Sequence, residues 1–148
     1  MIKVKRIDHV AIAVADRDEA SQKLSDLFGL CVGVHEHIAD QKTDVAFLNA
    51  AGAAASDDVA LEIIAPSGTA GNPSLGRFLD QRGPGLHHIC FEVDDLPGAL
   101  ASLKAAGVRL IDEVPRPGAR GHQIAFLHPA STGGVLFELC ASTNGAPA

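Results

Sequence analysis

The sequence contains no tryptophan and no tyrosine, and its only aromatic side chains are six phenylalanines. Tryptophan and tyrosine often dominate the binding energy of protein interfaces, so the sequence offers no such anchor from which to locate a subunit interface. Cysteine is also scarce, because only Cys31, Cys90 and Cys140 occur, and no two of them form a CxxC pair. This pattern argues against a disulfide framework or a structural zinc site. We expect three reduced thiols that act as small core residues.

Long apolar runs and clusters of basic residues are absent as well. No apolar run is long enough to cross a bilayer, and no signal-peptide pattern follows Met1. The formal net charge is -6, and no Lys/Arg-rich run offers an electrostatic footprint to a nucleic acid or a membrane surface. We therefore expect a cytoplasmic protein that binds neither. The 148 residues, 47% of them hydrophobic, are sufficient for a sizeable core.

The most informative feature present is an internal repeat. Three pairs of short segments match one another: 7–14 with 86–93, 45–48 with 124–127, and 61–63 with 137–139. The first two pairs share an offset of 79 residues, whereas the third has an offset of 76. Two matches at one offset indicate a duplicated unit, and the third indicates that the second copy is three residues shorter before its last strand.

Each copy is predicted to fold as β-α-β-β-β. Alternating apolar residues indicate the strands, and apolar residues at helical spacing indicate one helix in each copy. The helix of the first copy can be capped by Asp16 or Asp18 and ends at Gly29. In the first copy we predict a strand over 5–14, a helix over 16–27 and strands over 30–38, 45–50 and 59–64, with a small-residue connection over 52–58.

The second copy repeats this order. We predict a strand over 86–93, a helix over 96–106 that Gly107 ends, and strands over 108–114, 123–128 and 135–140. A turn-rich loop over 66–73 and a short helix over 74–81 lie between the copies, and the tail after residue 142 is predicted to be frayed. The chain is thus predicted to be one α+β domain, residues 1–148, with module one at 5–66, a linker at 67–84 and module two at 85–142.

The repeat selects four candidate metal ligands. Each copy carries one histidine and one glutamate at matching positions, namely His9 and Glu62 in the first and His88 and Glu138 in the second. Duplicated strands place equivalent side chains about a pseudo-twofold axis, so these four can converge on one divalent metal. Singly, a histidine at a strand start is more often structural, and a glutamate in an apolar run more often faces water from an edge strand. Duplication of both favours the metal site.

Six blocks in order resemble the vicinal oxygen chelate superfamily and, within it, the methylmalonyl-CoA epimerases. They are DHVAIAV at 8–14, GLHHI at 85–89, VDD at 93–95, LIDEVPR at 110–116, AFLHPAST at 125–132 and GVLFEL at 134–139. Any one of them alone is a weak signal, but six in order are specific. The resemblance covers nearly the whole chain and implies two tandem βαβββ modules that form a cupped, barrel-like mixed sheet around one metal.

The resemblance also implies a function and a set of partners. His9, Glu62, His88 and Glu138 match the four ligands of the family, although many relatives carry Gln where this chain has Glu62. Two imidazoles and two carboxylates suit Co²⁺, which we expect, or Mn²⁺, Ni²⁺ or Zn²⁺. The implied substrate is an acyl-CoA thioester, the implied reaction is epimerisation of methylmalonyl-CoA at C2 through a metal-stabilised enolate, and the implied assembly is a homodimer. Glu138 is the implied acid/base.

The second acid/base is not evident in the sequence. Some relatives carry a glutamate at the position that matches Val45 here. Asp44 is adjacent but belongs to the other face of a regular strand, so it could serve only if a bulge turned it inward. A water molecule on the metal or another residue could also serve, so the question stays open.

Several further residues have two interpretations each. His87 alternates away from His88, which favours a supporting or helix-packing role over metal ligation. Cys90 and Cys140 share strand parity with His88 and Glu138, but a buried apolar role is favoured over thiolate ligation. Polar residues of Gly- and Pro-rich connections could line a cleft mouth or be ordinary loop residues; these are Arg116, Arg120, Ser131 and Thr132.

Three classes of function remain open from the sequence. The first is the epimerase. The second is another metal enzyme of the same fold, either a glyoxalase I type lyase with the same ligand set or an extradiol dioxygenase, against which the extra Glu62 counts. The third is a non-catalytic small-molecule binding protein, for which loss of metal ligands would be expected, whereas all four are present.

Overall fold

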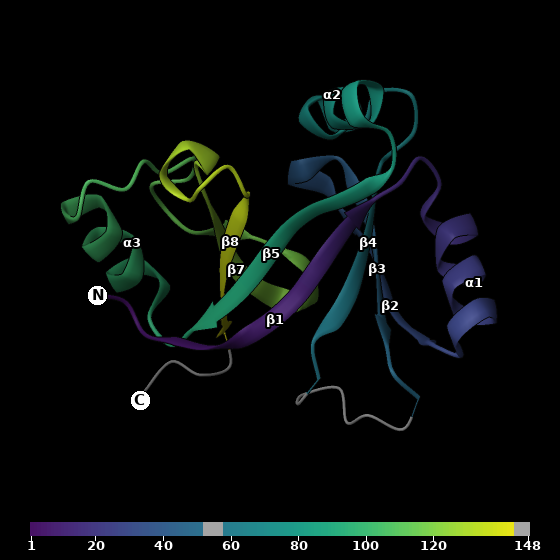
Figure 1. Ribbon diagram of the computed structural model, residues 1–148, viewed down its shortest axis with the longest axis horizontal. Helices are drawn as coiled ribbons and strands as arrows, with labels where there is room; N and C mark the ends of the chain where they lie inside the picture. Colours follow the sequence, from purple (N-terminus) through teal and green to yellow (C-terminus); the bar gives the residue numbers. More distant parts are fainter. Residues whose placement is uncertain (52–57, 144–148) are drawn as a thin grey trace. The chain divides into compact units, whose positions relative to one another are not determined.

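The computed structural model describes residues 1–51 and 58–143 (Figure 1). The chain divides into two compact units. The first-module unit comprises residues 9–87, and the second-module unit comprises residues 1–8 and 88–148. The first strand, β1 (Val4–Ala13), contributes its beginning to the second-module unit and its remainder to the first-module unit.

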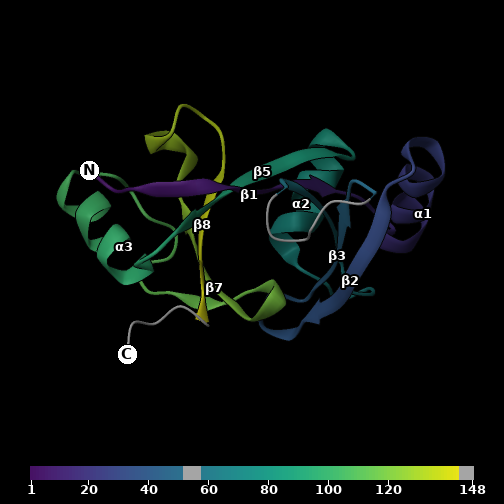
Figure 2. The ribbon, with the colours of Figure 1, turned by 90° about the horizontal axis from the view of Figure 1, so that it is seen from below.

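The first-module unit contains a four-stranded sheet in the order β2-β3-β4-β1 (Figures 1 and 2). Strands β1 and β4 are parallel, and the other neighbours are antiparallel. The elements are α1 (Arg17–Phe28), β2 (Cys31–Ile38), the 3-10 helix η1 (Ala39–Gln41), β3 (Thr43–Asn49), β4 (Ala60–Pro66) and α2 (Pro73–Arg82).

Helix α1 covers one face of this sheet. It starts because the Asp16 side chain accepts a hydrogen bond from the Glu19 backbone N–H, and it ends at Gly29, whose φ of 67° is readily adopted by glycine. Residues Ala20 and Leu24 of the helix pack against the sheet residues Val14, Ala46, Leu48, Ile63 and Ala65. The other face of β3 and β4 is therefore not covered by α1.

The second-module unit repeats the arrangement, with strands in the order β1-β5-β8-β7-β6. Strands β5 and β8 are parallel, whereas β7 is antiparallel to both β8 and β6. The elements are β5 (Gly85–Val93), α3 (Leu96–Ala105), β6 (Arg116–Pro117), η2 (Ala119–Gly121), β7 (His122–Leu127), η3 (Pro129–Ser131) and β8 (Phe137–Ser142). Leu96, Ala99 and Leu100 of α3 pack against Val93, Ala125, Leu127 and Leu139.

The predicted α+β class and the β-α-β-β-β order of each copy are confirmed. Between the copies, the predicted short helix is present as α2. The predicted connection at 52–58 lies almost entirely outside the described residues, as does the tail after Thr143. In the described part of the chain, no helix is both long and apolar enough to span a membrane.

One predicted strand and one predicted core residue are wrong. Residues 108–114 do not form a strand; only Leu110 makes an isolated bridge to Leu127, and the strand beside β7 is the two-residue β6. The backbone N–H groups of Ile111 and Asp112 both donate to the same Phe126 carbonyl, and the Asp112 side chain accepts from the Phe126 N–H, so the regular alternation of a ladder is not formed. Cys31 is exposed because it starts the edge strand β2, whereas Cys90 and Cys140 are buried as predicted.

Candidate metal-binding residues in each module

The first-module unit brings His9 and Glu62 together. His9 Nε2 lies 3.2 Å from Glu62 Oε2, and both side chains are buried. The register explains this contact: Ala11 of β1 is paired with Glu62 of β4, so His9 lies two residues earlier on the same face. Phe47 of β3 is paired with Glu62 and presents its ring edge-on to His9, with 5.6 Å between ring centroids.

The second-module unit contains the same arrangement. His88 Nε2 lies 3.3 Å from Glu138 Oε2, and both side chains are buried. Cys90 of β5 is paired with Glu138 of β8, so His88 again lies two residues before the partner of the glutamate. Phe126 of β7 is paired with Glu138 and lies edge-on to His88, at 5.1 Å between centroids. The duplication is thus reproduced in side-chain geometry as well as in strand order.

These pairs contradict the interpretation of the glutamates as water-facing residues of edge strands. Strands β4 and β8 each have a neighbour on both sides, and Glu62 and Glu138 are only 6% and 5% exposed. Burying a carboxylate is costly unless it is paired or bound to a metal. Imidazole nitrogen and carboxylate oxygen are donors that suit divalent transition metals, so each His–Glu pair fits a metal ion chemically.

Val45 and Asp44 are placed as the strand pattern predicts. Val45 is paired with Ile64 and so lies on the face of Phe47 and Glu62, and no bulge interrupts β3. Asp44 points to the other face, where its Oδ1 lies 2.8 Å from His37 Nδ1 and accepts a hydrogen bond from Ser67 Oγ at 2.8 Å. Asp44 is therefore not turned toward Glu62.

The contact among His37, Asp44 and Ser67 has the residue types of a hydrolase triad but not its geometry. Ser67 Oγ and Asp44 Oδ1 both approach the same ring nitrogen, His37 Nδ1, at 2.9 and 2.8 Å. A proton relay needs the two partners on opposite nitrogens of the ring. Burial by itself would raise the pKa of Asp44, but the hydrogen bonds from His37 and Ser67 outweigh it and lower the pKa below 3.8. This cluster joins β2 and β3 to the loop that follows β4.

Two buried thiols, Cys90 and Cys140, each lie two residues after a candidate metal ligand of the second module in the sequence. Cys90 and Cys140 pack with Ile124. A hydrogen bond with Cys90 lowers the pKa of Cys140 to about 7 against the effect of burial, and His122 acts in the same direction. Burial raises the pKa of Cys90.

An ion-pair network that the sequence did not suggest lies in the same unit. Asp8 is buried, its Oδ1 accepts a hydrogen bond from Arg6 Nη2 at 2.7 Å, and its Oδ2 is paired with Arg120. Arg6 also donates to Glu92 at 2.7 Å. A buried carboxylate held by two guanidinium groups is compensated, so we assign Asp8 a structural role. The one sequence feature that could have indicated this network was the acidic residue Asp8 inside an apolar strand.

The loop residues considered for a cleft mouth have structural contacts. Arg116 is paired with Asp112 at 3.1 Å and lies over the Phe126 ring, 5.5 Å from its centroid. Ser131 Oγ accepts from the Arg109 N–H, and Thr132 Oγ1 donates to the Val135 carbonyl.

In the first-module unit, His87 packs on Phe78 of α2, with 4.9 Å between the ring centroids, which confirms the helix-packing interpretation of His87.

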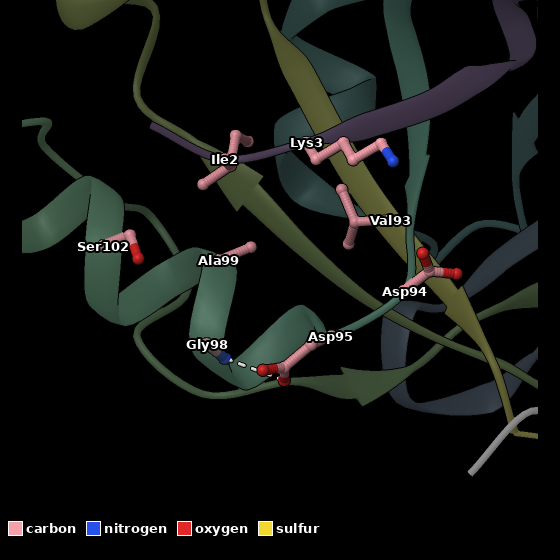
Figure 3. A pocket seen from close by; sticks show the side chains of 8 residues that line it. All are labelled: Ile2, Lys3, Val93, Asp94, Asp95, Gly98, Ala99 and Ser102. Carbon is pink, nitrogen blue, oxygen red and sulfur yellow. Dashed lines mark hydrogen bonds between the residues drawn. The ribbon is translucent and has the colours of Figure 1, made fainter. Parts of the chain in front are cut away.

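A separate hollow of about 190 Å³ lies where β5 runs into α3 (Figure 3). Ile2, Val93 and Ala99 give it apolar walls. Asp95 turns its carboxylate back to the Gly98 N–H at 3.0 Å, so that group caps the helix. The hollow contains neither of the His–Glu pairs, and we assign it no chemistry.

The fold and the His–Glu pairs together define a class of protein. The family model described as the glyoxalase/bleomycin resistance protein/dioxygenase superfamily matches residues 8–126, and the chain belongs to this superfamily. The resemblance inferred from the sequence blocks is thereby confirmed.

Individual relatives narrow the comparison. The chain is 41% identical to protein YqjC of Bacillus subtilis, over 93% of this chain and 92% of YqjC. It is 34% identical to the ethylmalonyl-CoA/methylmalonyl-CoA epimerase of Cereibacter sphaeroides, over 92% of this chain and 97% of that protein. Among solved structures, methylmalonyl-CoA epimerase in complex with methylmalonyl-CoA and NH4+ superposes with a TM-score of 0.86 at 32% identity, covering 99% of this chain and all of that one.

Proposed function

We propose that the protein is a metal-dependent epimerase that interconverts (R)- and (S)-methylmalonyl-CoA. The observation that carries this proposal is the pair of buried His–Glu contacts at equivalent register positions of the two modules. The similarity to epimerases that act on methylmalonyl-CoA supports the choice of an acyl-CoA thioester as substrate.

The four ligands in this proposal are His9, Glu62, His88 and Glu138, and they hold one divalent metal ion. Their donor set of two imidazoles and two carboxylates suits Co²⁺, which we expect, as well as Mn²⁺, Ni²⁺ and Zn²⁺. When bound, such an ion supplies Lewis acidity toward a thioester carbonyl, which makes the adjacent C2 proton more acidic. The phenylalanine rings beside both histidines restrict their orientation.

Glu138 is the proposed acid/base on one face of the substrate. Its carboxylate takes the C2 proton, and the electron pair of the broken C–H bond is delocalised into the thioester as an enolate. Return of a proton to the opposite face of C2 inverts the centre. The reaction therefore needs a second proton donor that Glu138 alone does not provide.

Exchange of the C2 proton tests the proposal directly. Methylmalonyl-CoA in D2O, followed by NMR, should lose its C2 proton signal with metal-loaded protein and retain it with EDTA-treated protein. Metal content per chain, measured on the same samples, verifies that EDTA removed the ion. Absence of exchange with a fully loaded protein would overturn the epimerase proposal.

Two further substrates test the substrate range and the reaction class of the protein. Ethylmalonyl-CoA tests whether a longer 2-substituent is accepted, as the name of the Cereibacter sphaeroides relative suggests for that enzyme. A glutathione hemithioacetal tests the lyase alternative, which shares the His/Glu/His/Glu ligand set. Conversion of the hemithioacetal without exchange of methylmalonyl-CoA would assign the protein to the lyases. A homodimer remains our expectation from the family resemblance.

A further inference from the structure

We propose that Arg116 of β6 binds the free carboxylate of the methylmalonyl group. The assignment rests on the proposed epimerase function and names a residue that recognises the part of the substrate that a simple acyl-CoA lacks. The sequence gave Arg116 two interpretations, a residue of a cleft mouth or an ordinary loop residue. The contacts of Arg116 within the second-module unit favour the first.

Strand register places Arg116 on the same face of the sheet as Glu138. Arg116 is paired with Ile124 across β6 and β7, and Phe126, two residues further along β7, is paired with Glu138 of β8. Directly opposed residues of antiparallel strands share a face, as do alternate residues of one strand. Arg116, Phe126 and Glu138 therefore lie on one face. Helix α3 packs against the other face, to which Ala125 belongs.

A series of side-chain contacts connects the Arg116 guanidinium to the His–Glu pair of this unit. Arg116 Cζ lies 5.5 Å from the centroid of the Phe126 ring. The same ring lies edge-on to His88, with 5.1 Å between centroids, and His88 Nε2 lies 3.3 Å from Glu138 Oε2. The guanidinium and the imidazole that we propose as a metal ligand therefore contact the same aromatic ring.

Asp112 holds one side of the guanidinium and leaves the other side available. Asp112 Oδ1 accepts a hydrogen bond from Arg116 Nε at 3.1 Å, and Asp112 Oδ2 accepts from the Phe126 N–H at 2.9 Å. Within residues 1–51 and 58–143, Asp112 is the only carboxylate paired with Arg116. The two Nη groups are a planar pair of donors, which matches the geometry of a carboxylate. Because 35% of the Arg116 side chain is exposed, a ligand can reach it.

The position of Arg116 favours the carboxylate over the phosphates of CoA. In methylmalonyl-CoA the carboxylate is attached to C2, whereas the pantetheine arm separates the phosphates from that carbon. Glu138 is the proposed acid/base at C2, so a cation beside the His88–Glu138 pair is placed for the carboxylate. The corresponding position of module one, opposite Val45, carries Glu36, so the repeat supplies this cation in one module and not in the other.

The binding of two CoA thioesters tests the assignment. Propionyl-CoA has the same carbon chain at the thioester and the same CoA as methylmalonyl-CoA, but it lacks the carboxylate. In metal-loaded Arg116→Gln, the affinity for methylmalonyl-CoA, measured by isothermal titration calorimetry, should fall by roughly 10–100-fold, because charge-assisted hydrogen bonds are lost. The affinity for propionyl-CoA should stay within about threefold of wild type, since no partner of the guanidinium is present, and this result also verifies that the variant is folded.

Two further variants separate the guanidinium geometry from the overall charge. Arg109→Gln removes the same charge from an exposed residue of the same unit and should leave both affinities unchanged. Arg116→Lys keeps the charge but loses the planar pair of donors, so its affinity for methylmalonyl-CoA should lie between those of wild type and Arg116→Gln.

Two results would overturn the assignment. Equal losses of affinity for the two thioesters in Arg116→Gln would mean that Arg116 contacts the CoA moiety or supports the fold, and an unchanged affinity for methylmalonyl-CoA would mean that it binds no part of the substrate. The proposed function is tested separately by C2 exchange. A wild-type protein whose affinity for methylmalonyl-CoA depends on Arg116, but which does not exchange the C2 proton, would retain the carboxylate site and overturn the epimerase.

Discussion

The two modules agree in the His–Glu pairs and differ in the strand that flanks them. Both place a histidine two residues before the partner of a glutamate, with a phenylalanine edge-on to the imidazole. Module one then adds the eight-residue β2 with Glu36 opposite Val45, whereas module two adds the two-residue β6 with Arg116 opposite Ile124. A metal ion can be bound by equivalent ligands, but a CoA thioester has no twofold symmetry. The modules thus match at the ligand positions and diverge at the flanking position.

The largest effect should come from comparing the two glutamates. Glu138→Gln removes the proposed acid/base and should lower C2 exchange by roughly 10²–10⁴-fold. Glu62→Gln keeps a carbonyl oxygen as a ligand and removes no proposed acid/base, so its C2 exchange at saturating metal should fall less than that of Glu138→Gln. Exchange rates and metal content of both variants, measured at saturating metal, check this.

A different outcome would contradict the proposed difference between the two modules. Equal losses of activity in Glu62→Gln and Glu138→Gln, at equal metal content, would mean that the two modules contribute equivalently to proton transfer. The structure provides an internal reference, since the two His–Glu distances are nearly the same, at 3.2 and 3.3 Å.

The cores of the two modules should respond alike to truncation. Leu48 and Leu127 occupy matching repeat positions and are 1% and 6% exposed, each within the cluster that faces its module's helix. Leu48→Ala and Leu127→Ala should each lower the free energy of unfolding by about 2–5 kcal/mol, because each leaves a cavity in a packed core. Urea unfolding monitored by circular dichroism measures both. A loss below about 1 kcal/mol in one variant would show that its module repacks around the cavity.

The helix caps offer a smaller matched test. Asp16 and Asp95 are also equivalent in the repeat and accept hydrogen bonds from the backbone N–H groups of Glu19 and Gly98 at 2.9 and 3.0 Å. Asp16→Ala and Asp95→Ala should each cost about 0.5–2 kcal/mol of unfolding free energy. Asp18→Ala is the control, because Asp18 is exposed and caps no helix, and it should cost less than either. A larger loss in the control would contradict the assignment of Asp16 as the cap.

Local sequence patterns predicted most of this architecture because the repeat doubled every signal. The alternation around His9 and His88 placed both histidines correctly on their strands, and Asp16 and Gly29 set the limits of α1. The same rules failed over 108–114, where Ile111 and Asp112 both bond to the backbone of Phe126 in place of a regular ladder. An apolar pattern records which side chains prefer burial, not which partner the backbone finds.

The pairs of His and Glu side chains could be selected from the sequence, but their neighbours could not. The pairing of Glu36 with Val45 could not be predicted, because β2 and β3 are joined through a turn whose length does not reveal the register. The pairing of Asp8 with Arg120 joins residues 112 positions apart, and no local rule predicts such a contact.

The smallest expected effect concerns a position where the two helices differ inside the core. Ser21 of α1 corresponds to Leu100 of α3, and both are 2% exposed. Within the described residues, the Ser21 hydroxyl is buried and has no hydrogen-bond partner, so it gains nothing from its polarity. Ser21→Ala removes this desolvated group and should raise the unfolding free energy by up to about 1 kcal/mol, since alanine also has a higher helix propensity. Thermal and urea unfolding of the variant measure this change, and Ser25→Ala serves as the opposite control because Ser25 Oγ donates to the Leu30 carbonyl at 2.7 Å. Destabilisation of Ser21→Ala would show that the hydroxyl is bonded in solution, and the helices would then differ in hydrogen bonding as well as in packing.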